Sequence, residues 1–180
     1  FAISQSNTGE RQSIIRSLDS LKQQLALATD DSVKIQISKW IGFAYESFSI
    51  DSALKYDSAF VLLSRTRQNK YPLEYSNALA SISTAYATKG KFVEALDALF
   101  KALSIAKENN DAWNTARAYR RIGFVYLQME NYRKAIQFCD LALQIDATTN
   151  NSSAAIDRIF LAKMYEKLNI SDSAVYYAEK

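Results

Sequence analysis

The chain has 180 residues, of which 48% are hydrophobic and 23% are charged, and its formal net charge is +3. It contains no histidine, one cysteine, one proline and four glycines. This composition excludes histidine-based catalysis, histidine-metal and cysteine-rich zinc sites, an internal disulfide and a turn-rich all-β fold. The small positive charge does not favour nucleic acid as a partner, and the absence of any run of about 18 apolar residues excludes a membrane span within this sequence.

Helices are predicted along the chain after an extended or disordered tail over residues 1–9, because no strand-like alternation persists. An opening helix from about Glu10 to Ala28 is interpreted as a cap over residues 10–30. Asp30 and Asp31 are adjacent in sequence, so we expect helix-capping groups rather than a pair of catalytic carboxylates. The later helices are expected to start near these residues: Ser32, Asp51, Pro72, Phe92, Asp111, Tyr132, Ser152 and Asp172.

A repeat of about 40 residues runs through this helical pattern. Four anchor tyrosines mark it: Tyr45, Tyr86, Tyr126 and Tyr165. Small residues stand at fixed offsets from them: Gly42 and Gly123 three positions before an anchor, and Ala95, Ala135 and Ala174 nine positions after one. These spacings place the small, aliphatic and aromatic residues on one helical face. Each copy is therefore predicted to be a helix hairpin that stacks on its neighbours.

The two middle copies carry the most specific form of the repeat. They read Ile82-Ser83-x-x-Tyr86 … Gly90-x-Phe92-x-x-Ala95-Leu96 and Ile122-Gly123-x-x-Tyr126 … Tyr132-x-x-Ala135-Ile136. This pattern resembles the tetratricopeptide repeat (TPR) family, in a variant longer than the usual period of about 34 residues. The resemblance implies an all-α solenoid, a right-handed superhelix of about nine helices. Its repeats would cover about 32–70, 72–109, 111–149 and 152–180, the last one truncated, within a single array over 10–180.

In the TPR family the first helix of each hairpin lines a concave face that holds peptides or partner proteins. The resemblance therefore implies a non-enzymatic protein- or peptide-binding module. Long repeats of this kind are similar to the sensor regions of bacterial membrane-anchored regulators and to cytoplasmic receptors for signalling peptides. We expect the sensing region of a larger regulatory protein. The alternative is a structural scaffold that self-associates through its open C-terminal end.

Members of the family that hold a peptide carboxylate use five polar residues of the concave face. The resemblance maps these positions onto Lys39, Phe43, Ser81, Arg117 and Arg121. The three cationic positions suit a carboxylate ligand, because charged donors form strong hydrogen bonds to it. Phe43 and Ser81 stand where the family has asparagine. Three basic matches leave open that these residues form an ordinary solvated surface.

Three arginines, Arg117, Arg120 and Arg121, are close together on one predicted helix. We interpret them as an exposed face with charge partners about one turn away; the functional alternative is a contact to an acidic peptide or a phosphate. Phe124 completes the candidate groove, because it falls two residues before an anchor as Phe43 does. Exposed aromatic side chains in a groove suit peptide binding.

Two other residues are expected to be structural. Trp40 is predicted to pack on the opening helix, and Cys139 to be an inert thiol in the core. The chain opens with Phe1-Ala2-Ile3 rather than methionine, so we expect an extracytoplasmic, periplasmic part of a membrane-anchored bacterial protein, with a cytoplasmic location as the alternative. No cofactor or metal is expected, since the sequence has no catalytic or ligand constellation.

Overall fold

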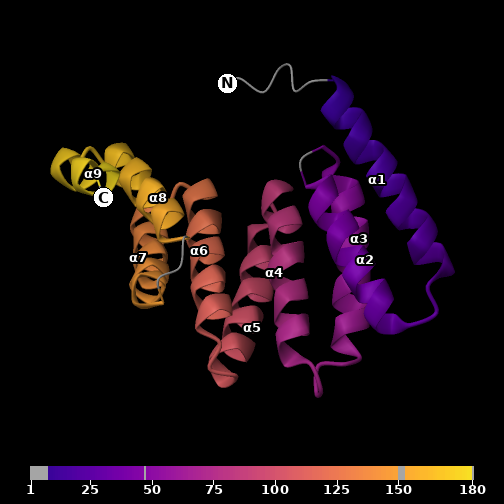
Figure 1. Cartoon of the computed structure of the whole chain (residues 1–180). Coiled ribbons are helices and arrows are strands. Elements are labelled where there is room, and N and C mark those ends of the chain that lie inside the picture. The colour runs from indigo at the N-terminus through magenta and orange to yellow at the C-terminus, as the bar shows by residue number, and fades with distance from the viewer. Residues whose placement is uncertain (1–7, 47, 150–152, 180) are drawn as a thin grey trace.

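The computed structural model describes residues 8–46, 48–149 and 153–179. Within these ranges nine α-helices follow one another, and no strand is present. Their bounds are α1 Thr8–Leu27, α2 Asp31–Tyr45, α3 Ile50–Arg65, α4 Pro72–Thr88, α5 Phe92–Glu108, α6 Ala112–Gln128, α7 Tyr132–Thr148, α8 Ala154–Lys167 and α9 Ser171–Ala178. They form a curved row with α1 and α9 at opposite ends (Figure 1). The all-α solenoid predicted from the repeat is confirmed.

The helices start within two residues of the predicted positions, because the starting signals act locally. The side chain of Asp30 caps α2 by accepting the backbone N–H groups of Ser32 at 2.7 Å and Val33 at 3.2 Å. Thr8 begins α1, so the helix includes the last two residues of the predicted tail, while residues 1–7 lie outside the described residues. None of the described helices is both long and apolar enough to cross a bilayer.

Three of the hairpins end their first helix with the same turn. The residue four positions after the anchor has a positive φ: 72° at Gly90, 58° at Glu130 and 57° at Asn169. The residue after it donates its backbone N–H to the anchor carbonyl, at 2.9, 2.9 and 3.0 Å respectively. In the first hairpin Ser49 donates to the Tyr45 carbonyl at 2.9 Å. The turn of the first hairpin is therefore one residue shorter than the turns of the other three.

The anchor rings lie against the second helix of their own hairpin. Three of them stack on an aromatic ring at centroid distances of 5.8, 5.6 and 5.5 Å: Tyr45 on Tyr56, Tyr126 on Phe138 and Tyr165 on Tyr177. The corresponding residue of the second hairpin is Ala98, which lines a cavity of about 390 Å³ together with Tyr86. The anchors therefore fix the hairpins through both backbone and ring contacts.

The small residues before the anchors allow the two helices of a hairpin to approach closely. A Cβ atom added to Gly123 would lie 2.6 Å from Cys139 Sγ, and one added to Gly42 would lie 3.1 Å from Asp57 Cγ. Cys139 is 2% exposed, and burial raises the pKa of its thiol to about 12. Cys139 is thus a buried, protonated thiol, as the sequence predicted.

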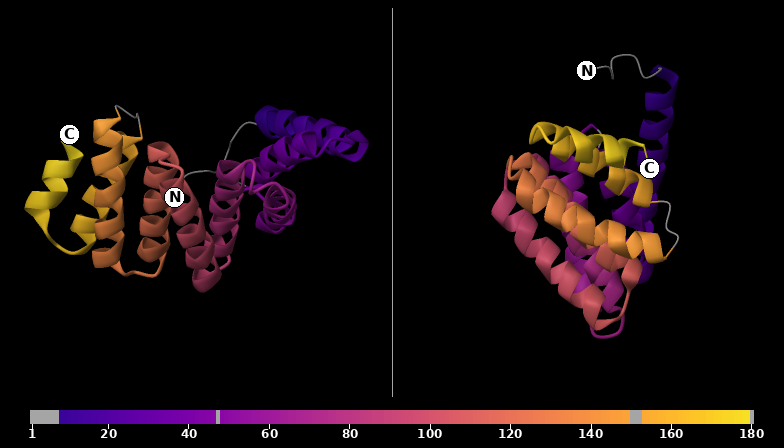
Figure 2. Two further views of the ribbon diagram at one scale, coloured as in Figure 1. Left: turned by 90° about the horizontal axis from the view of Figure 1, so that it is seen from below. Right: turned by 90° about the vertical axis from the view of Figure 1, so that its left-hand side faces the viewer.

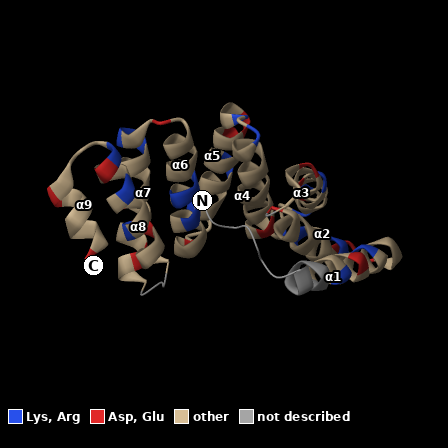
Figure 3. Cartoon of the chain, turned by 90° about the horizontal axis from the view of Figure 1, so that it is seen from above, with Lys and Arg blue, Asp and Glu red and all other residues tan. Residues whose placement is uncertain are grey.

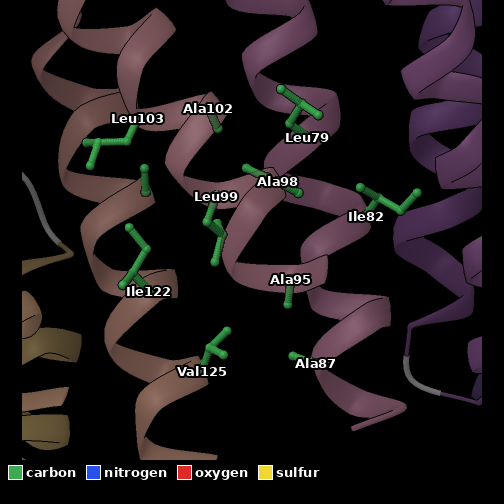
Figure 4. Packing of buried hydrophobic residues seen from close by; sticks show 12 residues of the cluster. Leu79, Ile82, Ala87, Ala95, Ala98, Leu99, Ala102, Leu103, Ile122 and Val125 are labelled. Carbon is green, nitrogen blue, oxygen red and sulfur yellow. The ribbon is translucent and has the colours of Figure 1, made fainter. Parts of the chain in front are cut away.

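The largest apolar cluster joins α4, α5 and α6 (Figure 4). Ala95 is fully buried in this cluster, and Ala135 is fully buried in the next cluster along the row. Ala174 on α9 is partly exposed. Because α4 and α6 share one core, their relative position is fixed by dense packing of small and aliphatic side chains. These two helices supply half of the residues that line the cavity considered next.

Candidate functional site

The first helices of three successive hairpins, α2, α4 and α6, lie next to one another on the concave side of the row (Figure 2, Figure 3). Together with one residue of α3 they line a cavity of about 330 Å³, here called the inner-wall cavity. Its lining residues are Lys39, Trp40 and Phe43 of α2, Glu46 directly after α2, Phe60 of α3, Asn77 and Ser81 of α4, and Trp113, Arg117 and Arg121 of α6. The cavity therefore lies on the wall where the sequence predicted a groove.

Three aromatic side chains stand open at this cavity. Trp40 is 55% exposed, Trp113 is 53% exposed and Phe43 is 61% exposed. The prediction that Trp40 packs on the opening helix is wrong, because the face of α2 that turns toward α1 is formed by Ile37 and Ile41. Trp40 lies off that apolar stripe and faces the cavity instead. Large exposed aromatic side chains beside a cavity are typical of binding surfaces.

Cations lie over the two tryptophan rings. Lys39 Nζ is 5.7 Å from the Trp40 ring centroid, and Arg117 Cζ is 5.2 Å from that of Trp113. At these distances the positive charge is attracted to the ring face. The contacts place a cation on each side of the cavity, one from α2 and one from α6. The cavity therefore has a charged and aromatic rim.

The guanidinium groups of Arg117 and Arg121 reach α4 without meeting a carboxylate. Arg117 Nη1 donates to Asn77 Oδ1 at 2.6 Å. Arg121 Nη1 donates to the Ala80 carbonyl at 2.5 Å and also to Thr84 Oγ1. Among the described residues neither arginine forms an ion pair with an aspartate or glutamate. Two partly buried positive charges are therefore held in place by neutral acceptors.

Burial favours the neutral form of the ionisable groups at this site, so it shifts the pKa values of the arginines and of the glutamate in opposite directions. It lowers the pKa of Arg117 to about 10 and also lowers that of Arg121, and in each case the neighbouring arginine adds to the effect while Glu46 opposes it. Burial raises the pKa of Glu46, against the attraction of both arginines. Arg117 remains protonated at neutral pH. The cavity thus has more positive than negative charge, which suits an anionic ligand.

The floor of the inner-wall cavity has a carboxylate behind it. Ser81 Oγ donates to Asp57 Oδ1 at 2.9 Å, and Asp57 is fully buried. Burial raises the pKa of Asp57 to about 6; Glu46 raises it further, while Ser81 and Arg121 lower it. Asp57 is therefore a titratable group joined by a hydrogen bond to a side chain that lines the cavity.

The structure brings together five of the seven predicted groove residues: Lys39, Phe43, Ser81, Arg117 and Arg121. The exposed-face interpretation of the arginine cluster is wrong, because all three side chains are at least partly buried. Arg120 points away from the inner-wall cavity and pairs with Asp146 and Asp157, both fully buried, with Nη2 lying 3.1 Å from Asp157 Oδ2. On α6, Arg117 and Arg121 are four residues apart and share a face toward α4, whereas Arg120 faces α7 and α8.

Phe124 also lies outside the inner-wall cavity. Its ring is 36% exposed and its centroid is 6.0 Å from that of Phe160 on α8. It therefore belongs to the next part of the concave wall. The sequence reasoning missed five lining residues: Trp40, Glu46, Phe60, Asn77 and Trp113. Asn77 holds the same repeat position as Arg117, so the repeat offset contained a signal for it, whereas Phe60 comes from a second helix and carries no such signal.

Several solved structures share this fold. A Rap protein complexed with competence and sporulation factor has a TM-score of 0.81 and 20% sequence identity, over 94% of this chain and 48% of that one. Aspartyl phosphate phosphatase F from Bacillus subtilis has a TM-score of 0.80 and 16% identity, over 92% of this chain and 46% of that one. BtubC from P. vanneervenii has a TM-score of 0.79 and 13% identity, over 95% and 72% respectively. The chain spans about half the length of the Rap and phosphatase structures.

No curated protein matches the sequence. Residues 10–145 match the family described as the SusR N-terminal TPR domain. The match covers most of the chain and includes the helices that line the inner-wall cavity. The tetratricopeptide resemblance is thereby confirmed, and the chain belongs to the SusR N-terminal TPR domain family.

Proposed function

We propose that the chain is a non-enzymatic binding module that recognises an acidic peptide segment with an aromatic residue in the inner-wall cavity, as the sensing region of a larger regulatory protein. The observation that carries the proposal is the pair Arg117 and Arg121. Both guanidiniums are partly buried, lack a carboxylate partner among the described residues and lie in the same cavity as Trp113. A ligand anion would supply the missing counter-charge.

The rest of the cavity supports a peptide as the ligand. Trp40, Phe43 and Trp113 give an aromatic rim on which an aromatic side chain can pack. The concave wall continues beyond the cavity to Phe124 and Phe160, so an extended chain has further contacts along it. In its solved structure, the Rap protein of the same fold is complexed with competence and sporulation factor.

Tryptophan fluorescence gives a direct test, because both tryptophans of the chain line the cavity. A peptide of alternating phenylalanine and glutamate is titrated into the protein, beside the same peptide with lysine in place of glutamate. We expect a saturable change for the acidic peptide and none for the basic one. Replacing Arg117 by glutamine should weaken binding by about tenfold or more, the effect of losing a charged hydrogen bond.

The control variant is R133Q, because Arg133 is an exposed arginine of α7 that does not line the cavity. It should bind the acidic peptide as the wild type does. Equal binding of both peptides, or equal weakening by R117Q and R133Q, would contradict a built anion site. Equal weakening would indicate attraction by overall charge alone, whereas equal binding of both peptides would show that charge does not select the ligand.

Self-association is the second candidate function. It is favoured by exposed apolar side chains on α8 and α9, where Ile156 is 48% exposed, Ile159 is 55% exposed and Val175 is 52% exposed. Sedimentation over a wide concentration range tests it: a scaffold gives a mass that rises with concentration and falls again in I159E. A constant monomer mass removes this candidate. The location outside the cytoplasm stays a prediction.

A further inference from the structure

A carboxylate lies directly behind the floor of the inner-wall cavity, where the packing does not require one. Asp57 on α3 is fully buried, and its Oδ1 accepts the hydrogen bond of Ser81 at 2.9 Å. Among the described residues its second oxygen, Oδ2, is buried without any hydrogen-bond partner. A buried carboxylate with one unsatisfied oxygen is costly when it is ionised. It is less costly when it is protonated, because the charge is gone.

The same position in the other hairpins is occupied by groups that are neutral when buried. Asp57 packs against Gly42, and Cys139 packs against Gly123 at the equivalent position, one residue further from its anchor because the first hairpin has the shorter turn. In the second hairpin the equivalent position holds Leu99, which is fully buried. The fold therefore accepts a thiol or an aliphatic side chain at this position. The carboxylate of the first hairpin has no role in packing that these groups do not fill.

The charged groups around Asp57 come from the C-terminal end of α2 and from α6. Glu46, directly after α2, raises the pKa of Asp57 and Arg121 on α6 lowers it, while α4 contributes the hydrogen bond from Ser81. Burial is the largest influence and brings the pKa of Asp57 to about 6. The chain has no histidine, so no imidazole competes for protons near this pH.

We propose that the inner-wall cavity takes up a proton on Asp57 when it binds an anionic ligand, and that Asp57 acts by positioning the hydroxyl of Ser81. The inference rests on the proposed function, since it assumes an anion in the cavity. When Asp57 is ionised, the Ser81 proton is committed to Oδ1 and the negative charge lies beside the ligand site. When Asp57 is protonated, its O–H donates to Ser81 Oγ, and the Ser81 hydroxyl is free to donate into the cavity.

Both changes favour an anion over a neutral ligand. Protonation removes a repulsive charge from behind the floor and adds a hydrogen-bond donor to it. By linkage, an anion in the cavity must strengthen proton binding at Asp57 by the same factor. Glu46 also lines the cavity and has a raised pKa, so it is the group from which Asp57 has to be distinguished.

The probe for the test is benzenesulfonate, an aromatic anion that does not itself titrate between about pH 5 and pH 8. Its binding is followed by the fluorescence of Trp40 and Trp113. The wild type is expected to bind it about tenfold more tightly at pH 5 than at pH 8, which corresponds to a shift of about one pKa unit at the coupled group. D57N is expected to bind with the low-pH affinity at both values, because its side chain is neutral.

Two matched variants locate the effect. E46Q should keep most of the pH dependence, and S81A should weaken binding at pH 5 more than at pH 8, because the relayed donor is lost. The carbon resonance of the Asp57 carboxyl provides a reading on the wild type alone: its midpoint should move to higher pH when benzenesulfonate saturates the cavity. That reading stands even if a variant fails to fold.

The outcomes separate the two proposals. Absence of benzenesulfonate binding at every pH overturns the anion-binding function, and the inference with it. Binding that is equal at pH 5 and pH 8, or a pH dependence that survives in D57N and disappears in E46Q, overturns the role of Asp57 and leaves the anion site intact. An Asp57 midpoint that does not move on saturation overturns it as well.

Discussion

Helix α6 carries arginines of two kinds on its two sides. Arg120 is 15% exposed and lies between Asp146 and Asp157, so its charge is matched by carboxylates from α7 and α8. Arg117 and Arg121 face α4 and meet only an asparagine, a carbonyl and a hydroxyl. Arg120, three residues after Arg117 and directly before Arg121, thus has a different role from both. A paired charge joins hairpins, and an unpaired one at a cavity is available to a ligand.

The acidic residues show the same division. Asp146 and Asp157 are fully buried beside a guanidinium, whereas Asp57 is fully buried beside a hydroxyl. Burial raises the pKa of Asp157, and Arg120 opposes the rise. Asp57 has the weaker compensation of Ser81 and the more distant Arg121. The third and fourth hairpins are therefore joined by the ion pairs of Arg120, whereas the first and second meet at a carboxylate that is hydrogen-bonded to a hydroxyl.

The largest effect on stability is expected from loss of the ion pairs of Arg120. R120M should destabilise the protein by about 3–5 kcal/mol, because it leaves two buried carboxylates without their shared partner. R117M should change stability by less than about 1 kcal/mol, since no carboxylate depends on Arg117. Denaturant unfolding of the two variants measures the contrast. Equal destabilisation would remove the distinction between the two sides of α6.

An intermediate effect on stability is expected for Asp57, the buried carboxylate beside Ser81. The folded-state pKa of Asp57 is raised from 3.8 to about 6, so its contribution to stability is complete below the unfolded-state value and is lost as the pH rises to about 6. D57N should therefore be more stable than the wild type at pH 8, by about 2 kcal/mol, and close to it at pH 4. Thermal unfolding across this range provides the check. A stabilisation by D57N that is independent of pH would show that Asp57 does not titrate here.

The smallest effect concerns the turns that close the hairpins. Glu130 and Gly90 occupy the same left-handed position, with φ of 58° and 72°. E130G should stabilise the protein by about 0.5–1 kcal/mol, and G90A should destabilise it by about 1 kcal/mol, because only glycine adopts this conformation freely. Denaturant midpoints distinguish the two. Opposite signs support equivalent turns along the row; equal signs would show that the two turns differ in strain.

The repeat predicts the fold because its signals are local and recur. The anchor at Tyr126 and the residue at Glu130 act within one hairpin, where a fixed offset determines backbone and ring contacts alike. The same offsets predict which residues of α2, α4 and α6 share the concave wall. Lys39 and Ser81 could be placed on one cavity because the TPR resemblance implies which offsets from the anchors line the concave face.

The offsets from the anchor tyrosines do not identify which residue of another helix or hairpin each side chain contacts. The partners of Arg120 lie 26 and 37 residues away, on α7 and α8, and neither falls at a repeat interval from it. Trp40 was assigned to the wrong face because the apolar stripe of α2 is formed by Ile37 and Ile41. Asp57 gave no signal because its environment is set by Ser81 on the following hairpin.

The most direct measurement of the central claim is a structure of the protein with the phenylalanine–glutamate peptide bound. The account predicts a carboxylate of the peptide within hydrogen-bond distance of both Arg117 and Arg121, and an aromatic ring packed against Trp40 or Trp113. A peptide held elsewhere on the row, or a cavity closed by side chains of the protein itself, would contradict it.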